Sequence, residues 1–251
     1  MNKYFILGLI SLITLISLAS CSKSTEPTVI LSMSEYFKAT PGSWWKYDTW
    51  STDSNGIRLD NTGKDSIYAS GIINLKGKNT TLCLAFDLLN PGQPDTALFY
   101  YVEGNKLYCL MPTISAYKKP GGKLDTSNWK WVMFADLDGS NWTVINDSMI
   151  VDSMGNKSKS YYTLTGSKGI QKNYNIKGRN ILCQQFIFNQ QMKMYMNIFG
   201  QDLLFSDSEL RVEYWFGNGV GLVNQITKVT KDMGFGFGIN SEIILVDYNI
   251  K

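Results

Sequence analysis

From about residue 43 onward, apolar, aromatic and β-branched residues occur in short runs separated by turn residues. This spacing is typical of antiparallel strands joined by tight turns. No stretch in this part keeps an apolar period of 3.6 residues with helix caps, so the pattern predicts at most one or two short helices, best placed at residues 34–39. The predicted strands include residues 44–50, 72–73, 82–88, 129–135, 142–146, 160–165, 180–188, 192–199, 210–216, 220–230 and 242–249.

One turn also predicts a pairing register. Residues 103–106, Glu-Gly-Asn-Lys, have the form of a two-residue hairpin connection with glycine first. This geometry places Val102 opposite Leu107, and Tyr100 opposite Cys109.

Roughly a dozen strands with hairpin-length connections imply one large antiparallel sheet, and a sheet of that size must curl, close or split in two. No break in composition divides this part of the chain. We therefore expect an all-β fold: a single domain over residues 35–251 with a large, strongly curved antiparallel sheet, half-barrel or barrel-like, with few or no helices. We expect residues 117–128 to be either a seam or a mobile loop over an opening.

The first residues have the layout of a secretory signal peptide: Lys3, then an apolar run over residues 4–18, then small residues. The run is too short to span a membrane comfortably. The closing Leu-Ala-Ser-Cys at residues 18–21 resembles the lipobox of bacterial lipoproteins. That resemblance implies cleavage of residues 1–20 and a lipid on Cys21. The polar, unpatterned residues 22–27 that follow indicate a tether, so we expect the acylated cysteine and tether to occupy residues 21–34. An ordinary signal peptide or a membrane anchor that happens to contain a cysteine is the alternative.

Charge and composition exclude several functions. The chain has 251 residues, with 24 Lys and Arg, 21 Asp and Glu and no His, for a net charge of +3. The absence of histidine excludes Ser-His and Cys-His nucleophile pairs and imidazole metal sites. The charges are interspersed, which gives no footprint for nucleic acid. With 7 Trp, 14 Tyr and 12 Phe, the chain is too apolar and aromatic to be disordered.

Beyond the cysteine of the lipobox, three others remain, Cys83, Cys109 and Cys183, each in an apolar, strand-like context. Buried free cysteine, packed as a small hydrophobic residue, is the favoured state for all three. A bridge between Cys83 and Cys109 is the best alternative, but a plain meander would place another strand between them.

Two aromatic and glycine-rich segments lie near the two ends of the predicted domain. Residues 36–47 contain Tyr-Phe, then Pro-Gly, then Trp-Lys-Tyr, and residues 213–223 contain aromatics followed by Gly-Val-Gly-Leu-Val. Together they resemble the two ends of a loose group of exported bacterial lipoproteins of unknown function. Lys-Ala stands at residues 38–39, where the group often has Pro-Leu. The resemblance implies a strongly curved antiparallel sheet, distantly like lipoprotein carriers and lipocalin-like barrels, and brings no catalytic residue.

The glycines of the second segment are Gly217, Gly219 and Gly221. Their spacing suits positive φ angles or close backbone approach at a turn or bulge. A phosphate-binding loop is a poor alternative, because no helix follows to supply N-terminal amides.

The tryptophans are the candidates for a ligand groove. If the sheet curves into a half-barrel, one face becomes concave and aromatic-lined, which suits an acyl chain or a sugar ring. The alternative is that they are ordinary core or cross-strand partners. The groove candidates are Trp44, Trp45, Trp129, Trp131 and Trp215.

Two segments superficially suggest metal binding. Met192, Met194 and Met196 would project from one strand face and could suit Cu(I), but an alternating core stripe explains them better. Residues 136–141 resemble a calcium loop, yet Phe134 stands where the first ligand should be; a tight polar turn explains them without metal. We therefore expect no metal and no cofactor.

Carboxylate pairs are the remaining candidates for catalysis. Glu209 and Glu213 would share one strand face, and Asp147 with Asp152 is a second pair. Nothing near them in the sequence supplies the apolar pocket that would separate their pKa values. We expect no catalytic residue, and an enzyme, if there is one, would be a carboxylate-dependent hydrolase.

These observations predict a lipid-anchored protein of a bacterial envelope that binds or carries an apolar or amphiphilic ligand without catalysis. Ser22 replaces the acidic residue typical of inner-membrane retention, which favours the outer membrane. The expected partners are the membrane, through the lipid on Cys21, and a lipid, a glycan or a neighbouring envelope protein. A structural or assembly lipoprotein is the main alternative.

Overall fold

Twelve antiparallel strands form one sheet in the computed structural model, which describes residues 31–89, 96–112, 127–153, 156–233 and 239–251. The predicted fold class is therefore confirmed. The sheet has the order β6-β5-β4-β3-β2-β1-β12-β11-β10-β9-β8-β7. The strands are β1 Trp44–Thr52, β2 Arg58–Leu75, β3 Lys78–Asp87, β4 Thr96–Glu103, β5 Lys106–Pro112, β6 Trp129–Asp136, β7 Asn141–Ser153, β8 Asn156–Ile176, β9 Arg179–Ile198, β10 Gln201–Gly217, β11 Gly221–Met233 and β12 Ser241–Asn249.

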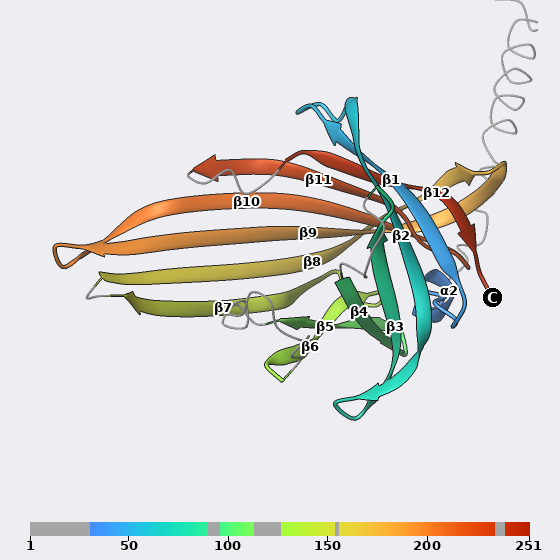
Figure 1. The fold of residues 1–251 in the computed structure, drawn as a ribbon, viewed down its shortest axis with the longest axis horizontal. Helices are drawn as coiled ribbons and strands as arrows, with labels where there is room; N and C mark the ends of the chain where they lie inside the picture. The colour runs from blue at the N-terminus through green and yellow to red at the C-terminus, as the bar shows by residue number, and fades with distance from the viewer. Residues whose placement is uncertain (1–30, 90–95, 113–126, 154–155, 234–238) are drawn as a thin grey trace, which may run out of the picture. The chain divides into compact units, whose positions relative to one another are not determined.

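The sheet curls until it is nearly closed into a barrel. Its two edge strands are β6 and β7, and the side chains of β6 reach across the interior to those of β9 and β10. The Phe134 ring stacks on Phe188 with centroids 4.6 Å apart and meets Tyr214 at 5.3 Å. The curvature thus creates a concave inner face, and β8, β9 and β10 extend well beyond the shorter strands (Figure 1).

The hairpin register predicted for residues 103–106 is confirmed. Val102 pairs with Leu107 and Tyr100 with Cys109, around a turn in which Gly104 has a φ of 59°. Positive φ at this position is what glycine supplies without steric cost. Local turn chemistry therefore sets the register between β4 and β5.

The prediction of two separate strands at residues 180–188 and 192–199 is wrong, because β9 runs without a break from Arg179 to Ile198. The polar residues between the two apolar runs have partners on the neighbouring strand. Gln191 lies opposite Glu209, and its amide Nε2 donates to the Glu209 carboxylate at 2.9 Å. Cross-strand hydrogen bonds of this kind keep polar residues within a strand.

One short helix is described, α2 at Met33–Tyr36, shorter than the predicted 34–39. The Glu35 carboxylate accepts hydrogen bonds from the Ser32 backbone N at 2.6 Å and from Ser32 Oγ at 2.9 Å, which caps the first turn. Phe37 leaves the helical conformation, and its ring packs on Tyr100 at 4.9 Å. Packing against the sheet therefore ends the helix early. No helix in the described part is long and apolar enough to cross a membrane.

β11 and β12 pair over only part of their length, so the sheet opens between their unpaired parts. These strands pair only where residues 224–227 of β11 lie opposite residues 241–244 of β12. The remainder of β12 continues beside β1, where Tyr248 lies opposite Trp45. The start of β11 stays with β10, and Gly221 lies opposite Gly217. A notch therefore opens between the end of β12 and the β10–β11 turn.

Candidate functional site

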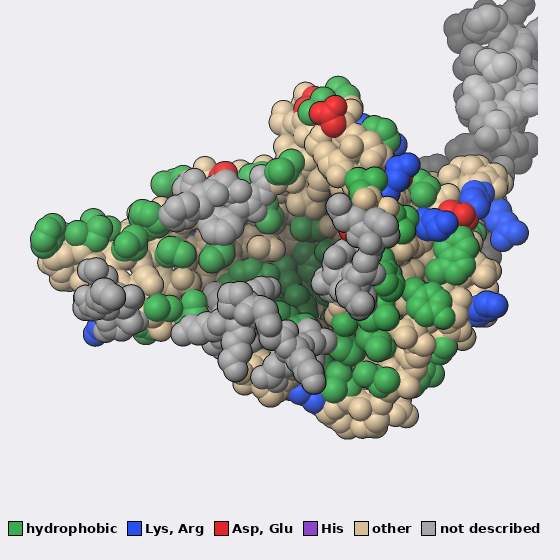
Figure 2. All heavy atoms as spheres, viewed as in Figure 1, with side chains coloured by type: hydrophobic (Ala, Val, Ile, Leu, Met, Phe, Trp, Pro, Cys, Tyr) green, Lys and Arg blue, Asp and Glu red, His purple; other side chains and the backbone are tan. Residues whose placement is uncertain are grey.

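The inner face of the sheet holds a cavity of about 340 Å³. Its walls come from β1 to β6 on one side and from β10 and β11 on the other. Figure 2 shows hydrophobic side chains gathered in a hollow between the long strands and the β1–β4 side. Most of the lining is aromatic or aliphatic: Phe37, Ala39, Trp45, Tyr47, Ile67, Leu98, Phe99, Tyr100, Leu110, Met111, Phe134, Tyr214, Phe216 and Leu222.

Two phenols supply polar groups in this lining. Among the described residues, neither the Tyr100 hydroxyl nor the Tyr214 hydroxyl has a hydrogen-bond partner. Burial raises the pKa of both side chains well above the usual value for tyrosine, so both remain protonated donors at neutral pH. The exposed Lys38 also belongs to the cavity wall, and it has no acidic partner in the described part. The cavity is therefore mainly apolar, and its polar lining consists of these phenols, the Gln225 carboxamide and one cation.

The two segments that resembled lipoprotein ends meet at the edge of this cavity. Trp45 Nε1 donates to the Val220 carbonyl oxygen at 2.5 Å, and the Tyr47 hydroxyl donates to the Leu222 carbonyl oxygen at 3.0 Å. Val220 lies in the β10–β11 turn, and Leu222 lies in the part of β11 that does not pair with β12. The side chains of β1 thus satisfy carbonyls that have lost a neighbouring strand.

The three turn glycines have different roles around this contact. Gly219 and Gly221 have φ angles of 69° and 94°, a backbone conformation that residues other than glycine rarely adopt. Gly217 has ordinary φ, but a Cβ there would lie 2.7 Å from carbons of both Ile181 and Val223. Close packing, rather than backbone conformation, therefore requires glycine at residue 217.

Of the five tryptophans predicted as groove candidates, Trp45 lines the cavity. Trp129 and Trp131 do not, because they occupy the other face of β6. Trp131 makes an edge contact with Tyr101 at 4.8 Å, and Tyr101 alternates along β4 with Tyr100, which faces the cavity.

Trp44 and Trp215 also lie on strand faces opposite to lining residues. Trp44 alternates with Trp45, and the Lys46 ammonium lies 5.1 Å from its ring centre. Trp215 alternates with Tyr214 and does not line the cavity; it packs in the core cluster that also holds Trp45 and Tyr47, with its ring centre 5.5 Å from that of Tyr174. The sequence could not assign faces to these rings, because the concave side of a sheet depends on long-range pairing.

The lining is instead dominated by tyrosine and phenylalanine, which were not among the predicted site residues. One sequence signal could have found them, which is alternation on a single strand. Tyr214 and Phe216 occur two residues apart, as do Leu98 and Tyr100. Such pairs share one face of a strand.

The carboxylates lie outside this cavity. Glu213 accepts from Gln185 Nε2 at 2.7 Å and from Arg211 Nε at 3.0 Å, and Glu209 is held separately by its glutamine partner. Both glutamates alternate with Tyr214 and so occupy the opposite face of β10. Asp147 accepts a hydrogen bond from the Ser148 backbone N, and the side chain of Asp152 lies outside the described residues. The glutamates thus form two separate polar contacts and share no reacting centre.

Packing accounts for one of the two segments considered for metal binding, and a polar turn accounts for the other. Met192, Met194 and Met196 share the face of β9 that carries the core residue Phe188, and they are half-buried. Asp136 accepts a hydrogen bond from the Asp138 backbone N at 2.9 Å, which closes a polar turn. In the described residues, no group of three or more His, Cys, Asp or Glu side chains is placed to hold a metal ion.

The three cysteines of the described part are buried and free. Cys83 on β3 and Cys109 on β5 both line the cavity, and β4 lies between their strands. Burial raises the pKa of Cys83 and of Cys183 to about 12. These thiols are therefore protonated and unreactive at neutral pH.

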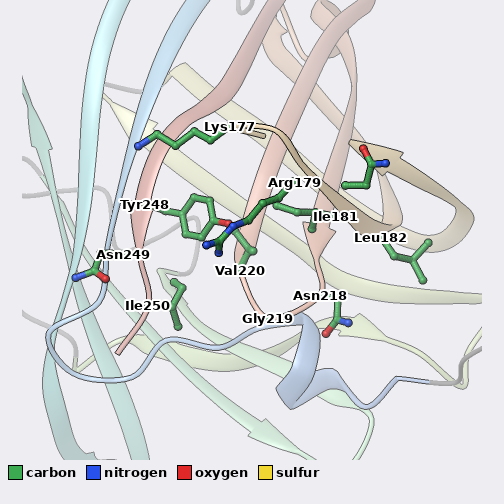
Figure 3. A pocket seen from close by; sticks show the side chains of 11 residues that line it. Lys177, Arg179, Ile181, Leu182, Asn218, Gly219, Val220, Tyr248, Asn249 and Ile250 are labelled. Carbon is green, nitrogen blue, oxygen red and sulfur yellow. The ribbon is translucent and has the colours of Figure 1, made fainter. Parts of the chain in front are cut away.

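A second pocket, of about 690 Å³, occupies the notch between β12 and the β10–β11 turn. Figure 3 shows that its side chains come from the β8–β9 turn, from the β10–β11 turn and from the end of β12. Arg179, Tyr248 and Asn218 are among them. No motif in the sequence indicates this pocket, because its three walls are distant along the chain.

Neither a protein-family model nor a curated protein matches the chain. Among solved structures, a candidate lipoprotein from Parabacteroides distasonis ATCC 8503 is similar, with a TM-score of 0.48 and 10% sequence identity over 85% of this chain and 98% of that chain. A candidate exported protein with a YmcC-like fold from Bacteroides fragilis NCTC 9343 has a TM-score of 0.44 and 7% identity, with the same coverage. Likeness at this level carries no functional argument.

Proposed function

We propose that this chain is a lipid-anchored protein of the bacterial envelope, attached to the outer membrane, that binds a small amphiphilic molecule in its inner cavity without catalysis. The observation that carries this proposal is the apolar cavity of about 340 Å³, whose lining includes the hydroxyls of Tyr100 and Tyr214, without hydrogen-bond partners among the described residues. Ligand pockets of soluble proteins typically combine an apolar wall with a few fixed polar groups.

The volume limits the size of the ligand. A water molecule occupies about 30 Å³ of liquid, so the cavity has room for on the order of ten non-hydrogen atoms. A medium-length acyl chain or a single ring system fits this space. A lipid with several long acyl chains does not.

The polar side chains of the cavity lining limit the chemistry of the ligand. Two protonated phenols donate hydrogen bonds, so the ligand carries an acceptor oxygen. Lys38 adds a positive charge at the wall, which favours a carboxylate. A medium-chain carboxylic acid meets both requirements, and decanoic acid is a suitable probe.

Binding can be measured with radiolabelled decanoate and the full chain in lipid nanodiscs. Leu98→Trp fills the cavity and should abolish saturable binding, whereas Leu203→Trp, at a position 48% exposed, should not change it. Tyr100→Phe keeps the cavity and should weaken binding roughly tenfold, the effect of one lost hydrogen bond to a charged group. Circular dichroism checks that each variant is folded. Absence of saturable binding, or binding that survives Leu98→Trp, contradicts the proposal.

The anchor needs a separate test, because Cys21 lies outside the described residues. Cells expressing the chain can be labelled with radioactive palmitate. Cys21→Ala should abolish the label, and Cys83→Ala, which removes a buried thiol, should retain it. Unchanged labelling of Cys21→Ala would refute a lipid on this residue.

Binding to another envelope protein is a second candidate, and exposed apolar residues at the β9–β10 turn favour it. Phe199 is fully exposed, and Leu203 and Leu204 nearby are 48% and 44% exposed. A photo-crosslinking residue at position 199 should then capture one reproducible partner in intact envelopes, while the same residue at the exposed position 72 should not. Identical patterns from both positions would contradict this role.

A further inference from the structure

The notch pocket is a built feature of the sheet, independent of the inner cavity. The β10–β11 turn separates the two spaces: Val220 lines the notch pocket, whereas Gly221 and Leu222 line the inner cavity. The hydrogen bond from Trp45 Nε1 to the Val220 carbonyl fixes the turn between them. The notch pocket therefore has its own walls, and its chemistry can be considered separately.

The charged lining of this pocket is positive. Arg179 is exposed and has no acidic partner among the described residues. Lys177 forms an ion pair with Asp247 at the rim, and no Asp or Glu is part of the lining. Figure 3 shows Arg179 and Tyr248 extending toward one another in the pocket. A guanidinium in this position offers a planar set of donors that matches a carboxylate.

Neutral polar groups surround this cation. The side chains of Asn218 and Asn249 line the pocket, and neither has a hydrogen-bond partner in the described part. Asn180 lines it too and accepts from Asn175 Nδ2 at 3.3 Å, which leaves its own amide N–H groups available. Each carboxamide can both donate and accept, as a hydroxyl-rich ligand requires.

The floor of the pocket is apolar. Ile181 and Val220 are 7% and 5% exposed, and Ile250 packs against the same core cluster. The volume of about 690 Å³ corresponds to on the order of twenty non-hydrogen atoms, the size of one or two sugar rings. Sugar rings present C–H groups on their faces and hydroxyls at their edges, which complements an apolar floor rimmed by carboxamides.

We propose that this notch binds an acidic saccharide, whose carboxylate pairs with Arg179 and whose hydroxyls bond the surrounding carboxamides. A simple anion would occupy a small part of the volume and would leave Asn218 and Asn249 without a role. A neutral sugar would leave the Arg179 charge without a partner. In the part of the chain that the structure describes, the pocket combines one cation without an acidic partner, several carboxamides and an apolar floor, and a uronic acid unit complements all three.

Titration of the full chain in lipid nanodiscs tests this assignment, with methyl β-D-glucuronide as the probe. Methyl β-D-glucoside has the same ring without the carboxylate, and inorganic phosphate has charge without the ring. Saturation-transfer NMR and calorimetry report binding up to about 10 mM, where even weak sites are detected. Arg179→Gln removes the charge and keeps polarity, and Arg211→Gln, which removes an arginine paired with Glu213, is the matched control.

The expected result is saturable glucuronide binding that falls roughly tenfold or more in Arg179→Gln and is unchanged in Arg211→Gln. The glucoside should bind more weakly by a similar factor. No saturable binding of the glucuronide, or binding that Arg179→Gln does not change, would overturn the site. Phosphate binding as tight as that of the glucuronide would overturn the assignment to a saccharide. None of these outcomes depends on decanoate binding in the inner cavity.

Discussion

The substitution Tyr47→Phe removes one hydroxyl oxygen and tests the contact that holds β1 to the unpaired start of β11. The Tyr47 side chain is 3% exposed, and its hydroxyl donates to the Leu222 carbonyl oxygen at 3.0 Å. Leu222 lies two residues before the part of β11 that pairs with β12, so Tyr47 takes the place of a neighbouring strand. Tyr47→Phe keeps the ring and its packing and leaves this carbonyl without that donor.

The expected loss follows from burial. A buried acceptor left without its partner costs about 1–3 kcal/mol, because water cannot replace the lost donor at a site this enclosed. Phenylalanine is less costly to bury than tyrosine, which offsets part of the loss. We therefore expect the free energy of unfolding to fall by about 1.5 kcal/mol. For a domain of this size that corresponds to a melting temperature about 3–6 °C lower.

Urea denaturation followed by circular dichroism measures this change. Tyr161→Phe is the matched control, because Tyr161 is 47% exposed and its hydroxyl donates to no described residue; its effect should stay within about 0.5 kcal/mol. If Tyr47→Phe is as stable as the control, the Leu222 carbonyl does not need this donor. β1 would then not support the β10–β11 turn through this hydrogen bond.

Three further changes test other parts of the structure by the same denaturation assay. Gly217→Ala places a methyl group 2.7 Å from two side-chain carbons and should cost about 1–3 kcal/mol, whereas Gly71→Ala, with open space around it, should be near neutral. Burial raises the pKa of Cys83 from 9.0 to about 12. Its contribution to stability is therefore complete below pH 9 and declines toward pH 12, by about 1.4 kcal/mol per pH unit, and Cys83→Ala should make the alkaline loss less steep. Phe199→Asn should keep or slightly raise stability, because Phe199 is fully exposed at a φ of 52°, which asparagine tolerates better; a clear loss would show that the ring has a packing role.

Local chemistry made part of this fold predictable. The glycine-first turn at residue 104 was enough to place Tyr100 opposite Cys109, because a two-residue connection leaves one register. The strand runs were found for the same reason, since β-branched and aromatic residues between turn residues leave few other conformations. The polar stretch around Gln191 was misassigned, because its partner Glu209 lies on another strand and no local pattern indicates it.

The candidate site was less predictable than the fold. Trp45 was among the predicted groove residues and lines the cavity, but Tyr100 and Tyr214 were not recognised. Alternation shows which residues share a face of one strand, and it does not show which face becomes concave. The notch pocket had no sequence signal, because Arg179 and Tyr248 belong to walls that only the split between β11 and β12 brings together.

The sequence by itself determined an all-β chain, the register of one hairpin and the glycines of the β10–β11 turn, because each depends on residues a few positions apart. Tertiary structure alone decided the cavity, the faces of the tryptophans and the notch. Trp45 and Val220 are 175 residues apart, yet one hydrogen bond between them holds the turn that separates both pockets. Closure of a twisted sheet depends on the pairing of all its strands together, and no segment of the chain contains that information.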